Sequence, residues 1–315
     1  MKPVIPFVSN ADGAERQAWR TALQEVLKDI ADVKTFEELT PDECEAAKVA
    51  IVANPDPAEV AALKNLIWVQ SLWAGVERLV GELPEDGPLI VRLTDPQLAD
   101  TMAEAVLAWT LYLHRDMPRY AQQQSRKMWK SHQLKLPEER TVGLLGMGNL
   151  GIKSAQRLKA NGFPVTGWSR NKKSIAGIET SHGPEGLKSL LAQSDIVVVL
   201  MPLTAETRGM IGAETFAHFK IGASLINFAR GPIIDTPALL STLDSGHLSH
   251  AVLDVFDQEP LPEEHPYWVH DKVTVLPHIS APTITSTAAK IVAGNIEQYL
   301  KTGAIPAAVD RTRGY

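Results

Sequence analysis

The chain has 315 residues, of which 44% are hydrophobic and 22% charged, and 31 basic against 37 acidic residues leave a net charge of −6. This balance predicts about two globular domains and excludes the dense basic face that general nucleic-acid binding requires. A single cysteine (Cys44), an N-terminus (MKPVIPFVSN) unlike a signal peptide and apolar runs too short for a bilayer predict a soluble, cytoplasmic protein without a membrane partner.

Residues 1–96 are predicted to alternate between strands and helices. Strand-like apolar runs cover 3–9, 48–54 and 66–72. Apolar residues recur at helical spacing over 14–30, and a short helix at 57–65 begins with a proline. Such alternation predicts a parallel sheet covered by helices.

A long helix is predicted for 97–127, between two β/α blocks. Pro118 is expected to kink this helix or to end its first part. We interpret it as a connector or a dimer arm because of its length and its place between the two blocks. One of its faces carries Leu98, Met102, Ala105, Val106, Trp109 and Leu113.

The second block begins at Thr141 and contains short strands that are apolar throughout. They cover 141–146, 164–168, 195–201, 223–229, 250–256 and 273–278, and helices at 149–161, 213–219 and 235–244 separate them. Such runs suit central parallel strands that are buried on both faces. A last helix at 284–301 could return to the first domain. The predicted fold class is α/β, with two doubly wound parallel-sheet domains.

A glycine-rich loop, Gly146-Met-Gly148-Asn-Leu-Gly151, follows the first strand of this block and opens a helix. In this context it predicts a dinucleotide site, in which Gly146 allows a tight turn and Gly148 lets the backbone approach a pyrophosphate. Gly151 allows close packing of helix on strand, and the helix N-terminus faces the phosphate charge. The alternative is a glycine-rich turn that binds no ligand.

The next strand ends at Trp168-Ser169-Arg170, where such folds usually have an acidic residue for the ribose hydroxyls. A carboxylate would repel a 2′-phosphate, whereas Ser169, Arg170 and Lys173 could hold one. The segment therefore favours NADP(H), with NAD(H) possible. The alternative is a solvated basic loop.

Three polar residues follow later strands: Arg230 in INFARGPIID, Glu259 in LDVFDQEPLP and His278 in VLPHISA. Their types suit reduction of a 2-oxo acid. Arginine can bind a carboxylate in a fork, histidine can donate a proton to a carbonyl oxygen, and a glutamate beside it would stabilise the imidazolium. Each residue taken alone could also be structural. No metal site is expected.

Four segments resemble signatures of the D-isomer-specific 2-hydroxyacid dehydrogenases: VGLLGMGNLG, NFARGPIIDTPALLSTLDSGHL, AVLDVFDQEPLPEEHPYW and VLPHISA. The resemblance covers most of 95–300 and implies that Arg230, Glu259 and His278 have the roles described. It also implies that Asp254 lies near the nicotinamide carboxamide, although this residue could be structural. Further cofactor contacts implied by the family are Asn149, Leu150, Pro202, Thr207, Phe228, Ala229 and Ser280.

The family resemblance also implies a substrate loop in SLWAGVERL. Backbone N–H groups of Ala74, Gly75 and Val76 would bind the substrate carboxylate. Trp73 stands where the family usually has glycine, so it either narrows the substrate pocket or packs in the core. The implied organisation is a substrate-binding domain of 1–96 and 285–315 and a dinucleotide-binding domain of 97–284. An arm at 97–130 would form a homodimer, and the active site would lie in the interdomain cleft.

Within the family, the stretches WSR and KS and the C-terminal VDRTRGY resemble the bacterial A-type, NADPH-preferring reductases of glyoxylate and hydroxypyruvate. Ala53-Asn54 departs from that group, which tends to have an aromatic residue there. Trp129 resembles a tryptophan that reaches the partner's site, or it packs within its own chain. One alternative is a dehydrogenase that acts on a larger 2-oxo acid or that prefers NADH. A less favoured alternative is a nucleotide-sensing binding protein on the same fold.

Overall fold

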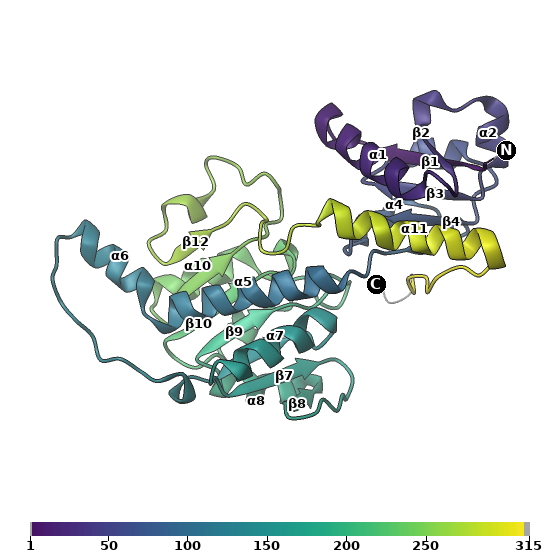
Figure 1. Ribbon diagram of the computed structural model, residues 1–315. Helices are drawn as coiled ribbons and strands as arrows, with labels where there is room; N and C mark the ends of the chain where they lie inside the picture. Colours follow the sequence, from purple (N-terminus) through teal and green to yellow (C-terminus); the bar gives the residue numbers. More distant parts are fainter. Residues whose placement is uncertain (1, 312–315) are drawn as a thin grey trace. The chain divides into compact units, whose positions relative to one another are not determined.

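The computed structural model describes residues 2–311 (Figure 1). By its contacts the chain divides into two compact units, residues up to 97 with those from 283 onward, and Leu98–Pro282. Each unit is a parallel sheet with covering helices, which confirms the predicted fold class. Of the stretch VDRTRGY, the last four residues lie outside the described part.

The first unit has a five-stranded parallel sheet in the order β2-β1-β3-β4-β5, the flavodoxin-like order. Its strands are β1 Val4–Ser9, β2 Asp32–Thr35, β3 Val49–Ala53, β4 Trp68–Ser71 and β5 Leu89–Val91. The prediction missed β2 and β5, which are short edge strands without a long apolar run. The helices are α1 Gly13–Leu27, α2 Pro41–Ala46, α3 Pro57–Ala62, α4 Glu77–Glu82 and α11 Thr285–Thr302.

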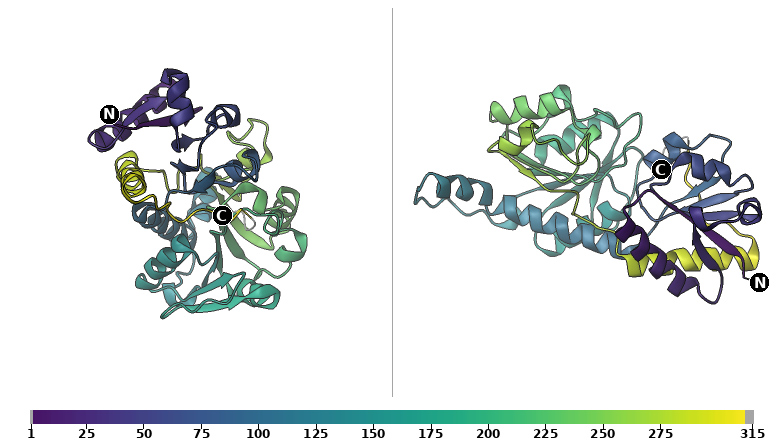
Figure 2. Two further views of the ribbon diagram at one scale, coloured as in Figure 1. Left: turned by 90° about the vertical axis from the view of Figure 1, so that its right-hand side faces the viewer. Right: turned by 90° about the horizontal axis from the view of Figure 1, so that it is seen from above.

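The last helix, α11, belongs to the first unit although it follows the second in sequence. Figure 2 shows it in yellow beside α1 in purple. Val292 and Ile296 join the apolar core that α1 enters through Leu23. Two partly buried polar contacts fix α11 further, since Asn295 Nδ2 donates to Gln70 Oε1 at 2.8 Å and Thr287 Oγ1 donates to Asp95 Oδ2 at 2.6 Å.

The second unit has a seven-stranded parallel sheet in the order β12-β11-β10-β9-β6-β7-β8. Its strands are β6 Val142–Leu145, β7 Val165–Ser169, β8 Glu179–His182, β9 Ile196–Val199, β10 Ala223–Asn227, β11 Leu248–Leu253 and β12 Val273–Val275. The helices α7 Asn149–Ala160, α8 Gly183–Gln193, α9 Ala213–Phe216 and α10 Thr236–Asp244 connect strands. Strand order reverses beside β6, which is where this fold binds ligands.

Two elements of the second unit, β8 and α8, were not predicted from the sequence. β8 is a polar edge strand, ETSH, and two glycines and a proline in the first turn of α8 obscure its helical period.

The helix predicted over 97–127 is divided into two helices close to Pro118, where a kink or the end of its first part was expected. They are α5 Pro96–His114 and α6 Met117–Ser125. Asp116 interrupts them with a left-handed φ of 53°, and Pro118 lies in the first turn of α6, where a missing N–H is tolerated. Met102 and Val106 of α5 pack into the core of the second unit. Among residues 2–311, none of the helices combines the length and apolar character that crossing a bilayer requires.

Candidate active site

The second unit brings the three predicted catalytic residues to one edge of its sheet. Arg230 follows β10, Glu259 follows β11 and His278 follows β12. These strands are neighbours and run parallel, so their carboxyl ends share an edge.

Glu259 and His278 form a hydrogen-bonded pair. His278 Nδ1 donates to Glu259 Oε2 at 2.7 Å, and the Phe256 N–H donates to Glu259 Oε1 at 2.9 Å. Both carboxylate oxygens are therefore oriented, and Nε2 of His278 remains for a substrate. The His278 side chain is 51% exposed, so a ligand can reach it.

The electrostatics of the pair favour an imidazolium. The hydrogen bond to Glu259 raises the pKa of His278, against burial and the nearby Arg230 charge, which lower it. Burial of Glu259 opposes its ionisation, yet its hydrogen bonds with His278 and Phe256 leave the carboxyl pKa lowered. Arg230 acts on both groups, so its guanidinium lies within electrostatic reach of the pair.

The turn that carries His278 is held by Asp254, which is 2% exposed. Its two carboxylate oxygens accept hydrogen bonds from the N–H groups of Ile279 at 2.7 Å and Ser280 at 2.9 Å. His278 itself has a left-handed φ of 54°, an unfavourable conformation that these contacts help to fix. The geometry supports the structural alternative for Asp254.

Arg230 is positioned by a neighbour that the sequence analysis did not single out. Asn227 is 1% exposed; its side-chain oxygen accepts from the Ala229 N–H at 3.1 Å and its amide donates to the Arg230 carbonyl at 3.0 Å. An asparagine at a strand end before a turn was the available signal.

Gly231 brings the Arg230 segment against the segment that leads to Glu259. A Cβ on Gly231 would lie 2.1 Å from the carbonyl carbon of Phe256, so only glycine permits this approach.

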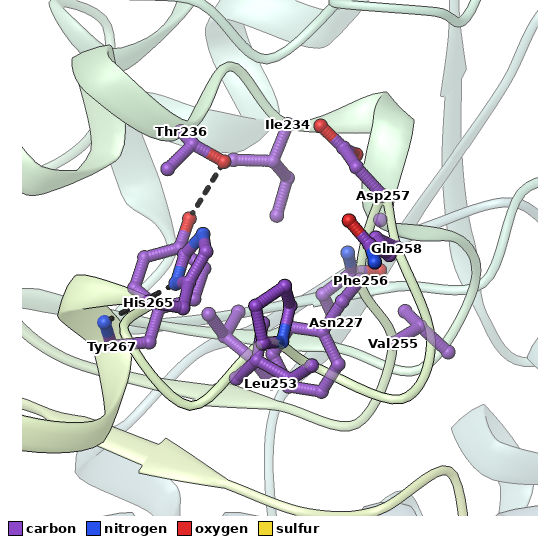
Figure 3. A pocket seen from close by; sticks show the side chains of 13 residues that line it. Asn227, Ile234, Thr236, Leu253, Val255, Phe256, Asp257, Gln258, His265 and Tyr267 are labelled. Atoms are coloured by element: carbon purple, nitrogen blue, oxygen red, sulfur yellow. Dashed lines mark hydrogen bonds between the residues drawn. The ribbon is translucent and has the colours of Figure 1, made fainter.

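A cavity of about 200 Å³ adjoins the same two segments (Figure 3). Its lining includes Gly231 and Gln258 but none of the three catalytic candidates. Tyr267 closes one side by donating its hydroxyl to Thr236 Oγ1 at 3.1 Å, and burial raises the pKa of Tyr267 to about 12.

The glycine loop fits a dinucleotide. Gly146 has a φ of +108°, and a Cβ there would lie 2.6 Å from Met201 N, while a Cβ on Gly151 would lie 1.9 Å from the Gly146 oxygen. Gly148 instead faces open space and caps α7 without a side-chain hydrogen bond. Asn149 and Leu150 form the first turn, so uncapped N–H groups and room for an anion coincide.

The predicted 2′-phosphate residues lie beside this loop, and each is engaged. The Ser169 hydroxyl donates to the Asn171 carbonyl at 2.8 Å, and Lys173 Nζ donates to the Met147 carbonyl at 2.8 Å. Arg170 Nη1 lies 2.6 Å from Glu206 Oε2, in an ion pair whose side chains are 42% and 66% exposed. Lys173 thus ties the basic segment to the glycine loop, and Glu206 is a partner that the sequence analysis missed.

The other predicted cofactor contacts occupy three places at this edge. The Thr207 hydroxyl donates to the Pro202 carbonyl at 2.8 Å after β9, and Phe228 and Ala229 are buried after β10. Ser280 is also buried, and its hydroxyl has no hydrogen-bond partner within residues 2–311. An unpaired buried hydroxyl is suited to a ligand.

The predicted substrate loop lies between β4 and α4 of the first unit. Trp73 packs edge-to-face on Trp19, with ring centroids 5.7 Å apart, and borders the apolar core. These contacts support the core-packing alternative. The Trp73 N–H donates to Ser71 Oγ at 3.0 Å. Of the three residues that follow, Ala74 and Gly75 are partly buried and Val76 is buried.

Trp129 is fully exposed, so the alternative that it packs within its own chain is wrong. Met128, Leu134 and Leu136 of the same irregular segment are also exposed.

Comparisons with known proteins show the family to which the chain belongs. The profile of the family "D-isomer specific 2-hydroxyacid dehydrogenase, NAD binding domain" matches residues 107–280. Glyoxylate/hydroxypyruvate reductase A of Salmonella heidelberg (strain SL476) is 38% identical over 275 residues, 85% of this chain and 88% of that protein.

Two solved structures are similar over the whole of both chains. One is a D-isomer specific 2-hydroxyacid dehydrogenase from Xanthobacter autotrophicus Py2 in complex with NADPH and MES, at 39% identity and a TM-score of 0.91. The other is an NADPH-dependent glyoxylate/hydroxypyruvate reductase from Sinorhizobium meliloti in complex with NADP and sulfate, at 29% identity and a TM-score of 0.87.

Proposed function

Because the chain belongs to the D-isomer-specific 2-hydroxyacid dehydrogenase family, we propose that it reduces a small 2-oxo acid to the 2-hydroxy acid with NADPH. The proposed substrates are glyoxylate and hydroxypyruvate, and the products are glycolate and D-glycerate. The observation that carries the proposal is the Glu259–His278 hydrogen bond with the Arg230 charge beside it. Oxidation of NADPH on addition of either substrate tests it.

In the proposed mechanism, bound NADPH supplies the hydride, and this chain's residues supply binding and the proton. Arg230 binds the substrate carboxylate and polarises the carbonyl. His278 donates its Nε2 proton to the carbonyl oxygen, and Glu259 holds the ring through Nδ1 and stabilises the imidazolium beforehand. The raised pKa of His278, caused first by its hydrogen bond to Glu259, favours the protonated form of the donor.

The cofactor part of the proposal depends on the end of β7. Arg170 is proposed to bind the 2′-phosphate, and no carboxylate at 168–170 would repel it. Lys173 contributes by holding the glycine loop through Met147, and the unpaired Ser280 hydroxyl is available to the nicotinamide. The NADPH and NADP complexes of the two similar structures support this reading.

Replacing Arg170 with alanine should raise the Kd for NADPH about 10-fold, the cost of one lost charge-assisted contact to phosphate. The Kd for NADH, which lacks the 2′-phosphate, should stay within about twofold. Fluorescence titration of both cofactors measures the two values. Equal weakening of both would show that Arg170 does not bind the 2′-phosphate.

The substrate loop and the assembly complete the proposal. Backbone N–H groups of Ala74, Gly75 and Val76 are proposed to bind the substrate carboxylate, with the first unit as the substrate-binding domain and the second as the dinucleotide-binding domain. The segment 97–130 is proposed as the arm of a homodimer, which the exposed Trp129 and Met128 side chains support. We propose a cytoplasmic location.

A further inference from the structure

The cation that we assign to the cofactor's 2′-phosphate already has an anionic neighbour. Glu206 Oε2 lies 2.6 Å from Arg170 Nη1. The two residues are 36 positions apart in the chain, so the contact is made by the fold and not by local sequence. Any phosphate that binds Arg170 must do so beside this carboxylate.

The turn that presents Glu206 is braced by two threonines. The Thr204 N–H donates to Thr207 Oγ1 at 2.8 Å, and the Thr207 N–H donates to Thr204 Oγ1 at 3.2 Å. The Thr207 hydroxyl donates in turn to the Pro202 carbonyl at 2.8 Å. These bonds brace the backbone on both sides of Glu206, so the ion pair opens by rotation of the two side chains and not by movement of this turn.

The segment that presents Arg170 is braced as well. Ser169 and Lys173, on either side of it, donate to the Asn171 and Met147 carbonyls. Arg170 follows β7 and Glu206 follows β9, and these strands flank β6, which ends in the glycine loop. The ion pair therefore joins the two segments that border the dinucleotide loop.

We propose that Glu206 is a cofactor-specificity residue that opposes the NADPH preference set by Arg170, and this inference rests on the proposed function. The carboxylate repels a 2′-phosphate of about −1.5 to −2 charge and competes with it for the guanidinium. NADH has a neutral 2′-hydroxyl at that position, which is not repelled and can donate a hydrogen bond to Glu206. Glu206 thus weakens the binding of NADPH relative to that of NADH, and the preference for NADPH becomes smaller.

The test compares Kd values for NADPH and NADH, measured by fluorescence titration without substrate, in the wild type and in Glu206→Gln. The glutamine keeps the shape and removes the charge. We expect NADPH to bind about fivefold more tightly at low salt, the scale of one exposed charge pair, and the gain to shrink at high salt. The Kd for NADH should be unchanged or slightly higher. Adenosine 2′,5′-bisphosphate against AMP, which lacks only the 2′-phosphate, should repeat the difference by calorimetry.

Glu37→Gln is the matched control, because Glu37 is also an exposed carboxylate, 2.8 Å from Arg16, and belongs to the first unit. It changes net charge equally and should leave both Kd values unchanged. Weaker NADPH binding in Glu206→Gln, or an unchanged ratio of the two Kd values, would overturn the inference. If Arg170→Ala leaves NADPH affinity unaltered, the 2′-phosphate assignment itself fails, which is a separate result.

Discussion

Replacing His278 with alanine is expected to lower kcat for 2-oxo acid reduction by about 10²- to 10⁴-fold, the contribution of a positioned general acid. The Kd for NADPH should hardly change, because the glycine loop and the segment after β7, which are proposed to bind its phosphates, follow other strands than β12, and the substitution keeps Ser280. Steady-state kinetics and fluorescence titration on one preparation measure both quantities. Near-normal turnover would remove His278 from the mechanism.

The same prediction has a pH signature. His278 must be protonated for reduction, and its hydrogen bond to Glu259 raises its pKa. Activity is therefore full below the raised pKa and is lost as pH rises through it. Glu259→Gln removes the anion that raises the pKa, so the loss should begin at a lower pH. A profile that does not move in this variant would contradict the role of Glu259.

Replacing Arg230 with alanine is expected to reduce kcat/KM for the 2-oxo acid by about 10²- to 10³-fold, because anchoring of the carboxylate and polarisation of the carbonyl are lost together. Arg230→Lys keeps the charge without the planar fork and should recover only part of the loss. Kinetics with a saturating cofactor measure the effect.

Arg230 also affects the proton donor, which separates its role from simple binding. Its charge lowers the pKa of His278, so Arg230→Ala should shift the loss of activity to higher pH, opposite to Glu259→Gln. If the KM for substrate is unchanged in Arg230→Ala, this residue does not anchor the carboxylate.

The central strands of both sheets could be predicted because burial on both faces leaves uninterrupted apolar runs in the sequence. The same reasoning located Arg230 and Glu259, which follow β10 and β11. His278 follows β12, an apolar strand that lies at the edge of the sheet and is only partly buried. Apolar runs did not reveal the polar edge strands β2 and β8. They also did not reveal Asp116, whose left-handed conformation divides the predicted long helix.

Apart from the Glu259–His278 pair, the contacts that orient the site could not be predicted, because they join residues distant in the chain. Asp254 holds the backbone after His278 across 25 positions or more, and Glu206 reaches Arg170 across 36. Hydrophobic period and motif spacing carry no information on such pairs. The contacts of Asn227 are different, because they are local. An asparagine before a turn is a known signal, from which these contacts could have been predicted.

The most direct test of the proposed function is the kcat/KM of the wild-type protein for glyoxylate, hydroxypyruvate, pyruvate and phenylpyruvate, each with NADPH and with NADH. We predict that glyoxylate and hydroxypyruvate with NADPH give the highest values. A higher kcat/KM for phenylpyruvate would contradict the assigned substrate. A higher kcat/KM for the small acids with NADH than with NADPH would contradict the assigned cofactor.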